Sequence, residues 1–234
     1  MTAPRNIYNV QGLLAYMKEN NQEVKTRPNE LNIVGIRKDS TTPNKFDDYI
    51  FVFYKNNNGS WESKMYPATT DPGTYFLNNP MQNYGTAILK AGQYKNAYQI
   101  GYHKGLYKAL TQKNPMTIIR DYNRDPVLDF NNGRESEGIF GINIHRATAQ
   151  GTSTNVDNWS AGCQVIADST NFNELMNLAE THRNLYGNSF NYTLIDERAY
   201  ARSFRKRIVF FLSALLIAGA TFYILYYRPK ILKK

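Results

Sequence analysis

Two residues able to carry nucleophilic chemistry lie 18 positions apart in the second half of the chain. His145 ends an alternating run, and Cys163, the only cysteine among 234 residues, follows Ser160-Ala161-Gly162. A thiolate nucleophile needs a base, a turn that exposes the sulfur, and amide N–H groups directed at the oxyanion. Gly162 permits a sharp turn and close approach of another backbone segment. Extended runs on both sides predict that His145 and Cys163 lie at the ends of neighbouring strands.

Cys163 and His145 could each have a purely structural role. A single cysteine is more often a small buried hydrophobic residue than a nucleophile, and a single histidine in a strand more often serves packing. The glycine turn between them shifts the balance, so the sequence favours a Cys163 nucleophile with His145 as its base.

The order of the two residues separates them from several cysteine enzymes. Papain-like and NlpC/P60-like enzymes have cysteine before histidine, whereas here His145 comes first. This order and spacing, with Ser-x-Gly-Cys at the second site, resembles the L,D-transpeptidase catalytic domain, also called the YkuD domain. That family has a strand histidine, a loop, and Ser/Thr-His-Gly-Cys followed by Arg or Asn. The resemblance covers about residues 31–196; His145, Ser160, Gly162 and Cys163 match, Ala161 replaces the second histidine, and Gln164-Val165 lacks the usual arginine.

The resemblance implies roles for the residues around the thiol. His145 would take the proton of Cys163, giving an imidazolium–thiolate pair with a lowered thiol pKa. The carbonyl of Arg146 would orient the histidine, and the N–H groups of Gly162 and Cys163 would hold the oxyanion. Ser160 is expected to orient the turn or contact substrate. The residues expected to grip substrate are Trp159 and Arg146.

The family acts on peptidoglycan, so the implied substrate is a stem peptide cleaved at the amide between its third and fourth residues. The acyl group then passes to an amine or to water, without a cofactor. Because the second histidine and the arginine are missing, transpeptidation and hydrolysis both remain open. The alternative from another class is a non-catalytic, membrane-anchored binding or structural module with a degenerate YkuD-like fold. The missing residues favour that module, and retention of both His145 and Cys163 opposes it.

The net charge of +9 belongs to the end of the chain. Seven of the 28 Lys and Arg residues lie from Arg205 onward, where there is no Asp or Glu, so the remainder carries 21 basic against 19 acidic residues. A nearly neutral body argues against a nucleic-acid partner.

The basic residues flank Ile208–Tyr227, twenty residues without a charge or a proline. A helix of that length spans about 30 Å, the thickness of the bilayer core. We predict a transmembrane helix over 206–228 and a basic tail over 229–234, hence a single-pass protein with a lipid partner. Both flanks are basic, so the positive-inside rule gives no orientation.

No secretory signal is visible at the N-terminus, and the anchor lies opposite to that of a typical bacterial family member. This arrangement favours a bacteriophage protein, located in a virion membrane or acting on the bacterial envelope at entry or lysis. A cellular origin is the alternative. The oligomeric state is not indicated.

Hydrophobic periodicity predicts a mainly β fold with a few helices. Residues 1–30 form a helical lead-in, with apolar residues at helical spacing from Val10 to Met17, and 31–198 form the catalytic domain. Strands are expected at 31–36, 49–55, 60–66, 86–90, 97–102, 106–112, 116–120 and 191–195, and a helix capped by Ser169 or Thr170 and ending at Gly187. Pro67–Pro80 is expected to be a loop. The regular spacing of the strands predicts an antiparallel sandwich or barrel.

One loop has the oxygen-bearing side chains that a metal site could use. In Asp121–Asp129, oxygen-bearing side chains at positions 1, 3, 5 and 9 imitate a calcium loop. Pro126 replaces the required glycine, so an Asx-rich turn is favoured, with calcium kept as the alternative. The three histidines and one cysteine show no zinc-ligand spacing, and no metal is predicted.

Overall fold

The computed structural model describes residues 6–40, 42–130 and 133–201. The chain up to Glu197 forms one compact unit, and a second begins at Arg198, of which residues 198–201 are described and helical. The predicted membrane segment 206–228 and the basic tail lie outside the described residues. Within the described part, no helix has the length and hydropathy needed to cross a membrane.

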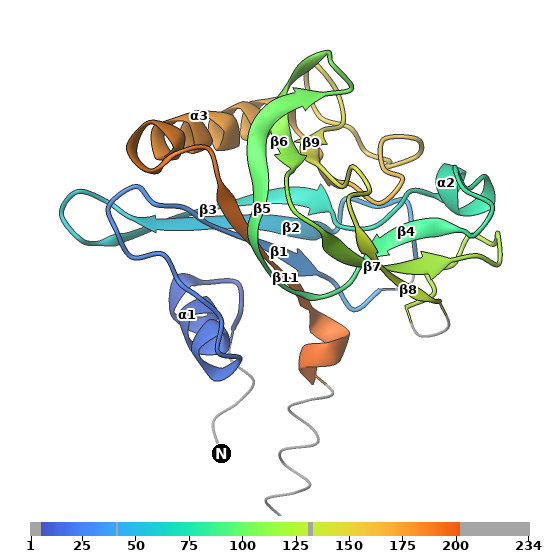
Figure 1. Ribbon diagram of the computed structural model, residues 1–234, viewed down its shortest axis with the longest axis horizontal. Helices are drawn as coiled ribbons and strands as arrows, with labels where there is room; N and C mark the ends of the chain where they lie inside the picture. Colours follow the sequence, from blue (N-terminus) through green and yellow to red (C-terminus); the bar gives the residue numbers. More distant parts are fainter. Residues whose placement is uncertain (1–5, 41, 131–132, 202–234) are drawn as a thin grey trace, which may run out of the picture. The chain divides into compact units, whose positions relative to one another are not determined.

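Eight strands of the first unit close into a barrel in the order β1-β11-β5-β6-β9-β10-β3-β2 (Figure 1). Their bounds are β1 Asn32–Arg37, β2 Asp48–Lys55, β3 Trp61–Thr69, β5 Gly92–His103, β6 Tyr107–Gln112, β9 Ile144–Arg146, β10 Gln164–Ile166 and β11 Phe190–Asp196. A separate sheet has the order β4-β7-β8, with β4 Thr86–Leu89, β7 Met116–Asp121 and β8 Glu135–Gly138. The predicted mainly β architecture is confirmed.

The strand spacing predicted an antiparallel barrel, but two pairs of neighbouring strands are parallel. β1 pairs with β11 in parallel, and β9 pairs with β10 in parallel. Parallel neighbours need a long crossover, and the stretch between Arg146 and Gln164 provides one without a helix. Strand direction depends on how such crossovers run, which local periodicity does not report.

Three helices accompany the strands: α1 Val10–Glu19, α2 Thr74–Asn78 and α3 Ser169–Tyr186. α1 appears where the apolar spacing predicts it. Its N-cap is Asn9, whose side chain accepts the N–H of Gly12. The cap of α3 is Asp168, which accepts from Thr170 and Asn171, so the predicted cap at Ser169 or Thr170 is wrong by one or two residues.

The segment Pro67–Pro80 was wrongly predicted as a loop throughout. β3 continues to Thr69, with Pro67 opposite Tyr49, and α2 follows. Proline is rare inside sheets, which is why the sequence predicted a break at this position. β8 was missed because Glu135–Gly138 has no apolar alternation.

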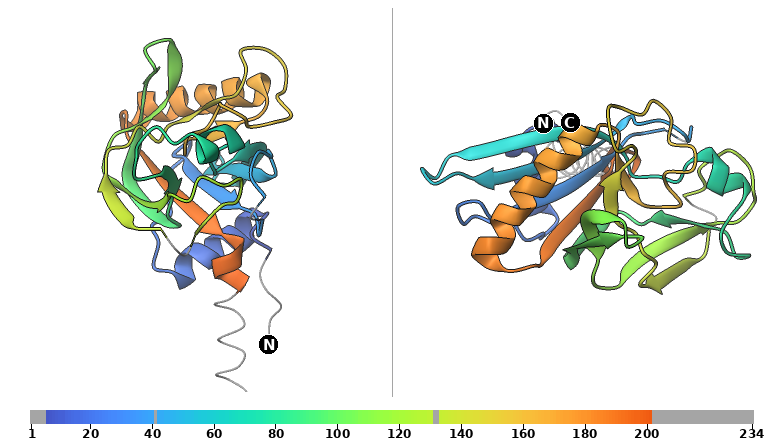
Figure 2. Two further views of the ribbon diagram at one scale, coloured as in Figure 1. Left: turned by 90° about the vertical axis from the view of Figure 1, so that its right-hand side faces the viewer. Right: turned by 90° about the horizontal axis from the view of Figure 1, so that it is seen from above.

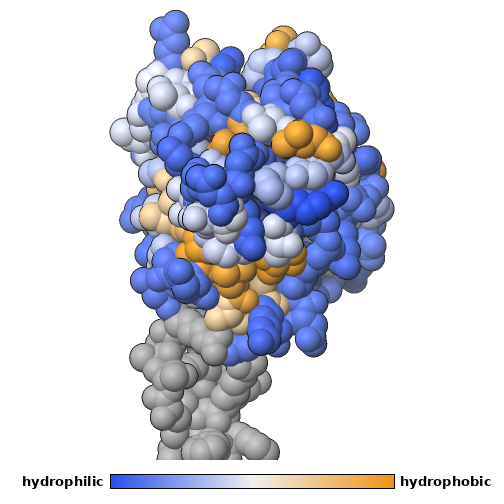
Figure 3. Space-filling view, turned by 90° about the vertical axis from the view of Figure 1, so that its left-hand side faces the viewer, coloured by the Kyte–Doolittle hydropathy of each residue, from blue (hydrophilic) through white to orange (hydrophobic). Residues whose placement is uncertain are grey.

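The helix α3 covers the strands that carry the candidate site. It packs against β6, β9 and β10 and buries Phe172, Leu175, Met176 and Ala179 in the main core. Figure 2 shows α3 lying along one side of the barrel, away from the β4-β7-β8 sheet. On the face opposite that sheet the surface is mostly hydrophilic, with one apolar patch in its lower half (Figure 3).

Candidate active site

Two parallel strands bring the predicted nucleophile and base to the same part of the sheet. His145 lies in β9 opposite Val165 of β10, and Cys163 immediately precedes β10. The N–H of Gln164 donates to the carbonyl of Asn143 at 2.9 Å, which places Cys163 beside Asn143. The prediction that both residues lie at the ends of neighbouring strands is confirmed.

The imidazole of His145 is buried and held from one side. Its Nδ1 lies 2.8 Å from the carbonyl oxygen of Arg146, the orientation that the family resemblance implies, and 3.4 Å from the hydroxyl of Tyr107. Because a carbonyl only accepts, Nδ1 carries the proton in the neutral ring. The lone pair is then on Nε2, which is buried and makes no hydrogen bond of normal geometry to a described residue, although the carbonyl of Trp159 also interacts with this histidine. A buried acceptor without a donor costs about 1–3 kcal/mol, so its presence calls for a functional explanation.

A second histidine lies against this ring. His103 stacks on His145 with ring centroids 4.0 Å apart and planes 22° from parallel. The side-chain amide nitrogen of Asn143 lies 3.0 Å from Nδ1 of His103, so that nitrogen accepts and His103 is also neutral. The carbonyl oxygen of the same amide accepts the N–H of Gln112 at 2.9 Å, which fixes its orientation.

Sequence reasoning missed this supporting group. His103 and Tyr107 pair across the β5–β6 hairpin, where 97–102 and 106–112 were predicted as strands. Asn143 lies two residues before His145 and therefore projects from the same face of an extended run. The sequence therefore showed the hairpin and the two-residue spacing of Asn143 and His145. Neither feature indicates which side chains face the thiol.

Cys163 is half-buried as a residue, and its thiol has polar backbone neighbours. Its Sγ accepts the N–H of Asn143 at 3.5 Å and donates to the carbonyl of Gly141 at 3.4 Å. Since Nε2 of His145 is without a partner, no hydrogen bond joins the sulfur to the imidazole in the free protein.

Burial holds both reactive groups neutral. It lowers the pKa of His145 to about 3, with the adjacent His103 acting in the same direction and the carbonyls of Arg146 and Trp159 partly opposing it. Burial also raises the pKa of the Cys163 thiol, against smaller lowering influences from the Asn143 N–H and Lys104. These two directions argue against the expected imidazolium–thiolate pair with a lowered thiol pKa in the free protein. Composition and spacing do not reveal how deeply a ring is buried.

The turn before Cys163 is rigid and internally hydrogen-bonded. Ser160 is fully buried, and its hydroxyl donates to the carbonyl of Cys163 at 2.8 Å and accepts the N–H of Gly162 at 3.1 Å. Ser160 thus orients the turn, and its expected contact with substrate remains a prediction. The Gly162 N–H is used inside the turn, which removes it from the expected oxyanion pair and leaves the Cys163 amide.

Gly162 meets both requirements that the sequence assigned to it. Its φ is +120°, and a Cβ there would lie 2.4 Å from the carbonyl oxygen of Ala87. Ala87 belongs to β4, so this contact joins the Cys163 turn to the β4-β7-β8 sheet.

The two flanking residues lie at the surface near the site. Arg146 is partly buried and places its guanidinium 4.3 Å from the ring centroid of Tyr107. Trp159 has 44 % of its surface exposed. Their expected grip on substrate remains a prediction.

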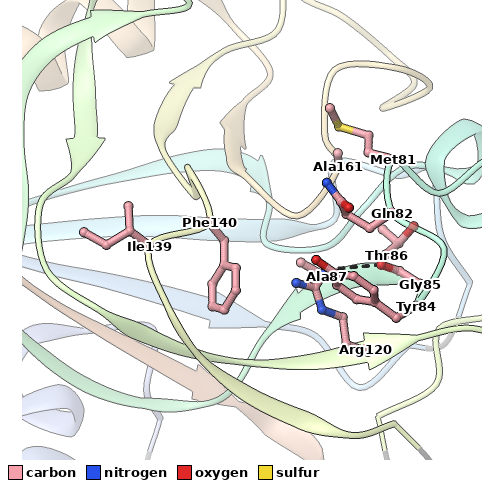
Figure 4. Close-up of a pocket in the computed structure, with 10 residues that line it drawn as sticks. All are labelled: Met81, Gln82, Tyr84, Gly85, Thr86, Ala87, Arg120, Ile139, Phe140 and Ala161. Carbon is pink, nitrogen blue, oxygen red and sulfur yellow. Dashed lines mark hydrogen bonds between the residues drawn. The ribbon is translucent and has the colours of Figure 1, made fainter.

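A cavity of about 400 Å³ adjoins the Cys163 turn (Figure 4). Ala161 of the turn and Phe140, next to Gly141, line it together with Arg120 and Tyr84. A larger cavity of about 640 Å³ shares Arg120 and Tyr84. Cys163 itself lines neither cavity, and the Cys163 turn reaches the smaller one through Ala161.

The Asp121–Asp129 loop directs its oxygens at its own amides. Asn123 donates to the carboxylates of Asp125 and Asp129, and the N–H groups of Val127 and Asp129 donate to Asp125 and Asp121. This is the Asx-rich turn favoured by the sequence. Within the described ranges, no group of three or more His, Cys, Asp or Glu side chains is arranged to hold a metal ion.

Comparison of the chain with protein-family models, with curated proteins and with solved structures finds no match.

Proposed function

We propose that this chain is a membrane-anchored cysteine enzyme that acts on peptidoglycan stem peptides through an acyl-enzyme on Cys163. In this proposal the barrel is a YkuD-like catalytic domain, and residues 206–228 form a transmembrane helix that holds it at a virion membrane or the bacterial envelope. The basic residues on both sides of the uncharged stretch Ile208–Tyr227 support a membrane location. The bacteriophage interpretation favours a virion membrane or the bacterial envelope.

One observation carries the proposal: His145 lies in β9 beside β10, the strand that Cys163 immediately precedes, with its Nδ1 held by the Arg146 carbonyl. That carbonyl fixes the proton on Nδ1, which leaves the lone pair on Nε2. A neutral imidazole of this tautomer is the form of histidine that acts as a general base.

The proposed reaction begins with neutral groups. Substrate binding displaces the thiol proton from the Gly141 carbonyl and turns it toward Nε2; catalytic hydrogen bonds are often incomplete before substrate binds. Sulfur then attacks the amide carbonyl carbon as Nε2 takes the proton, and the Cys163 amide stabilises the oxyanion. The C–N bond breaks, the leaving amine takes the proton from the imidazolium, and a thioester remains.

The second half-reaction releases the acyl group. An acceptor amine or a water molecule loses a proton to His145 and attacks the thioester carbonyl, and the C–S bond breaks with return of the proton to sulfur. With an amine the product is a cross-link, and with water it is a shortened stem peptide. Both outcomes belong to the proposal.

A non-catalytic binding module is the second candidate. The raised pKa of the Cys163 thiol and its hydrogen bond to Gly141 favour this reading, because both stabilise the unreactive thiol form. In that case the barrel would hold peptidoglycan peptides without cleaving them.

Muropeptide turnover separates the two candidates. Detergent-solubilised full-length protein and its Cys163→Ala variant are incubated with tetrapeptide muropeptides, and products are followed by mass spectrometry. The enzyme reading predicts release of the fourth residue, or a new cross-link, by the wild type alone. Identical product traces leave the binding module.

A further inference from the structure

A buried arginine lies on the wall of the cavity beside the Cys163 turn. Arg120 is in β7, opposite Ala87 of β4, with only 8 % of its surface exposed. One guanidinium nitrogen, Nη1, donates to the carbonyl of Gly85 at 3.2 Å. Nε is buried and has no partner. Figure 4 shows the side chain among Tyr84, Ala87 and Phe140.

This guanidinium has no counter-charge among the described residues. No described carboxylate lies within ion-pair distance, and the charge is offset only by two aromatic rings, with centroids at 4.6 Å for Tyr84 and 5.1 Å for Phe140. Such cation–π contacts offset only part of the cost of burying a charge. An unpaired buried charge is strongly unfavourable, so the site is incomplete as it stands.

The other deeply buried arginine of this fold provides a comparison. Arg37 is 1 % exposed, and its Nε lies 2.7 Å from a carboxylate oxygen of Asp71. Its remaining nitrogens donate to Thr70 and to the carbonyl of Leu89. The fold therefore supplies a carboxylate where a buried arginine is structural, and Arg120 differs in having none.

Arg120 is connected to the Cys163 turn through its strand partner Ala87. Ala87, its partner across the strands, is the residue whose carbonyl contacts Gly162 in the Cys163 turn. The cavity also has apolar walls, from Met81, Ile139 and Phe140. A ligand that fits both features has a carboxylate on a short aliphatic body.

We propose that Arg120 binds a carboxylate of the substrate whose amide carbonyl is presented to Cys163, and so takes the substrate-gripping role. The inference rests on the proposed function, because it names the part of that substrate held in this cavity.

The test measures binding in Cys163→Ala protein, so that its outcome is independent of catalysis. The probes are N-acetyl-D-alanine and its neutral amide, titrated by calorimetry into full-length protein. The carboxylate is expected to bind at least tenfold more tightly than the amide. Arg120→Met should abolish this preference, Arg120→Lys should retain only part of it, and Lys113→Met, a surface charge that lines neither cavity, should leave it unchanged.

Stability gives a second readout. Arg120→Met removes an unpaired buried charge and should not lower the denaturation midpoint, whereas Arg37→Met should lower it. Equal binding of the acid and the amide, or an unchanged preference in Arg120→Met, would overturn the proposal. Acetate binding as tightly as N-acetyl-D-alanine would also overturn it, by showing a site for free anions. If the wild-type protein does not turn over muropeptides but Cys163→Ala protein shows this binding, the proposed function is refuted and the carboxylate site stands.

Discussion

Replacement of Gly162 by alanine tests how the Cys163 turn is built. The φ of +120° is a region that residues with a Cβ rarely adopt, at a cost of about 1–3 kcal/mol. The added Cβ would also lie 2.4 Å from the carbonyl oxygen of Ala87, so that β4 or the turn must shift, at roughly 1–3 kcal/mol. The expected loss is about 2–6 kcal/mol, a large share of the roughly 5–15 kcal/mol that stabilises a folded domain.

Gly59 is a matched control for this substitution. It has a φ of +80° in the β2–β3 turn, and a Cβ there would meet nothing within 4 Å. Gly59→Ala therefore pays only the conformational cost, about 1–2 kcal/mol. Urea unfolding followed by circular dichroism compares the two variants.

The reasoning also predicts a local effect. Because Gly162 joins the Cys163 turn to β4, its replacement should change the rate of Cys163 alkylation, while Gly59→Ala should leave that rate unaltered. If Gly162→Ala loses no more stability than Gly59→Ala, the Ala87 contact does not constrain the turn and the description of the site is incorrect.

Two further predictions concern the neutral state of the site. Alkylation of Cys163 by iodoacetamide in the free protein should have its pH midpoint above the value of about 8.5 of an unperturbed cysteine, since burial raises the thiol pKa; a midpoint near 6 would reveal a thiolate–imidazolium pair. The folded-state pKa of His145 is about 3 against 6.5, so its contribution to stability is complete above pH 6.5 and is lost as pH falls toward 3. At pH 5 the loss is about 2 kcal/mol by urea unfolding, and His145→Gln should show correspondingly less acid sensitivity than the wild type. The opposite contribution of Asp48, whose pKa is raised to about 7 and whose stabilisation is lost as pH rises, cancels in that difference. Equal acid sensitivity would mean that folding does not lower the pKa of His145.

Local patterns predicted much of the fold. The alternation around the turn Asn56–Gly59 predicted the β2–β3 hairpin, and helical spacing predicted α1 and α3. These elements depend on residues close together in the sequence. The parallel pairing of β9 with β10 and of β1 with β11 depends on long-range contacts, which a single sequence does not specify.

In the candidate site, too, local features were predicted and long-range contacts were not. The turn at Gly162 and its close backbone contact were predicted correctly because both follow from glycine itself, whereas the use of its N–H within the turn was not predicted. The roles of His103 and Asn143 arise from strands far apart along the chain. The unpaired state of Arg120 could not be predicted either, since a sequence does not show which charges find a partner once they are buried.

Intact-protein mass spectrometry of the acyl-enzyme tests the central claim most directly. Full-length wild-type protein mixed with a tetrapeptide muropeptide should gain the mass of the donor without its fourth residue, in a form released by hydroxylamine as a thioester is. Cys163→Ala should gain nothing, and His145→Gln should form the adduct far more slowly. A wild-type protein whose mass never changes while the muropeptide is consumed, or an identical adduct on Cys163→Ala, would contradict a Cys163 acyl-enzyme.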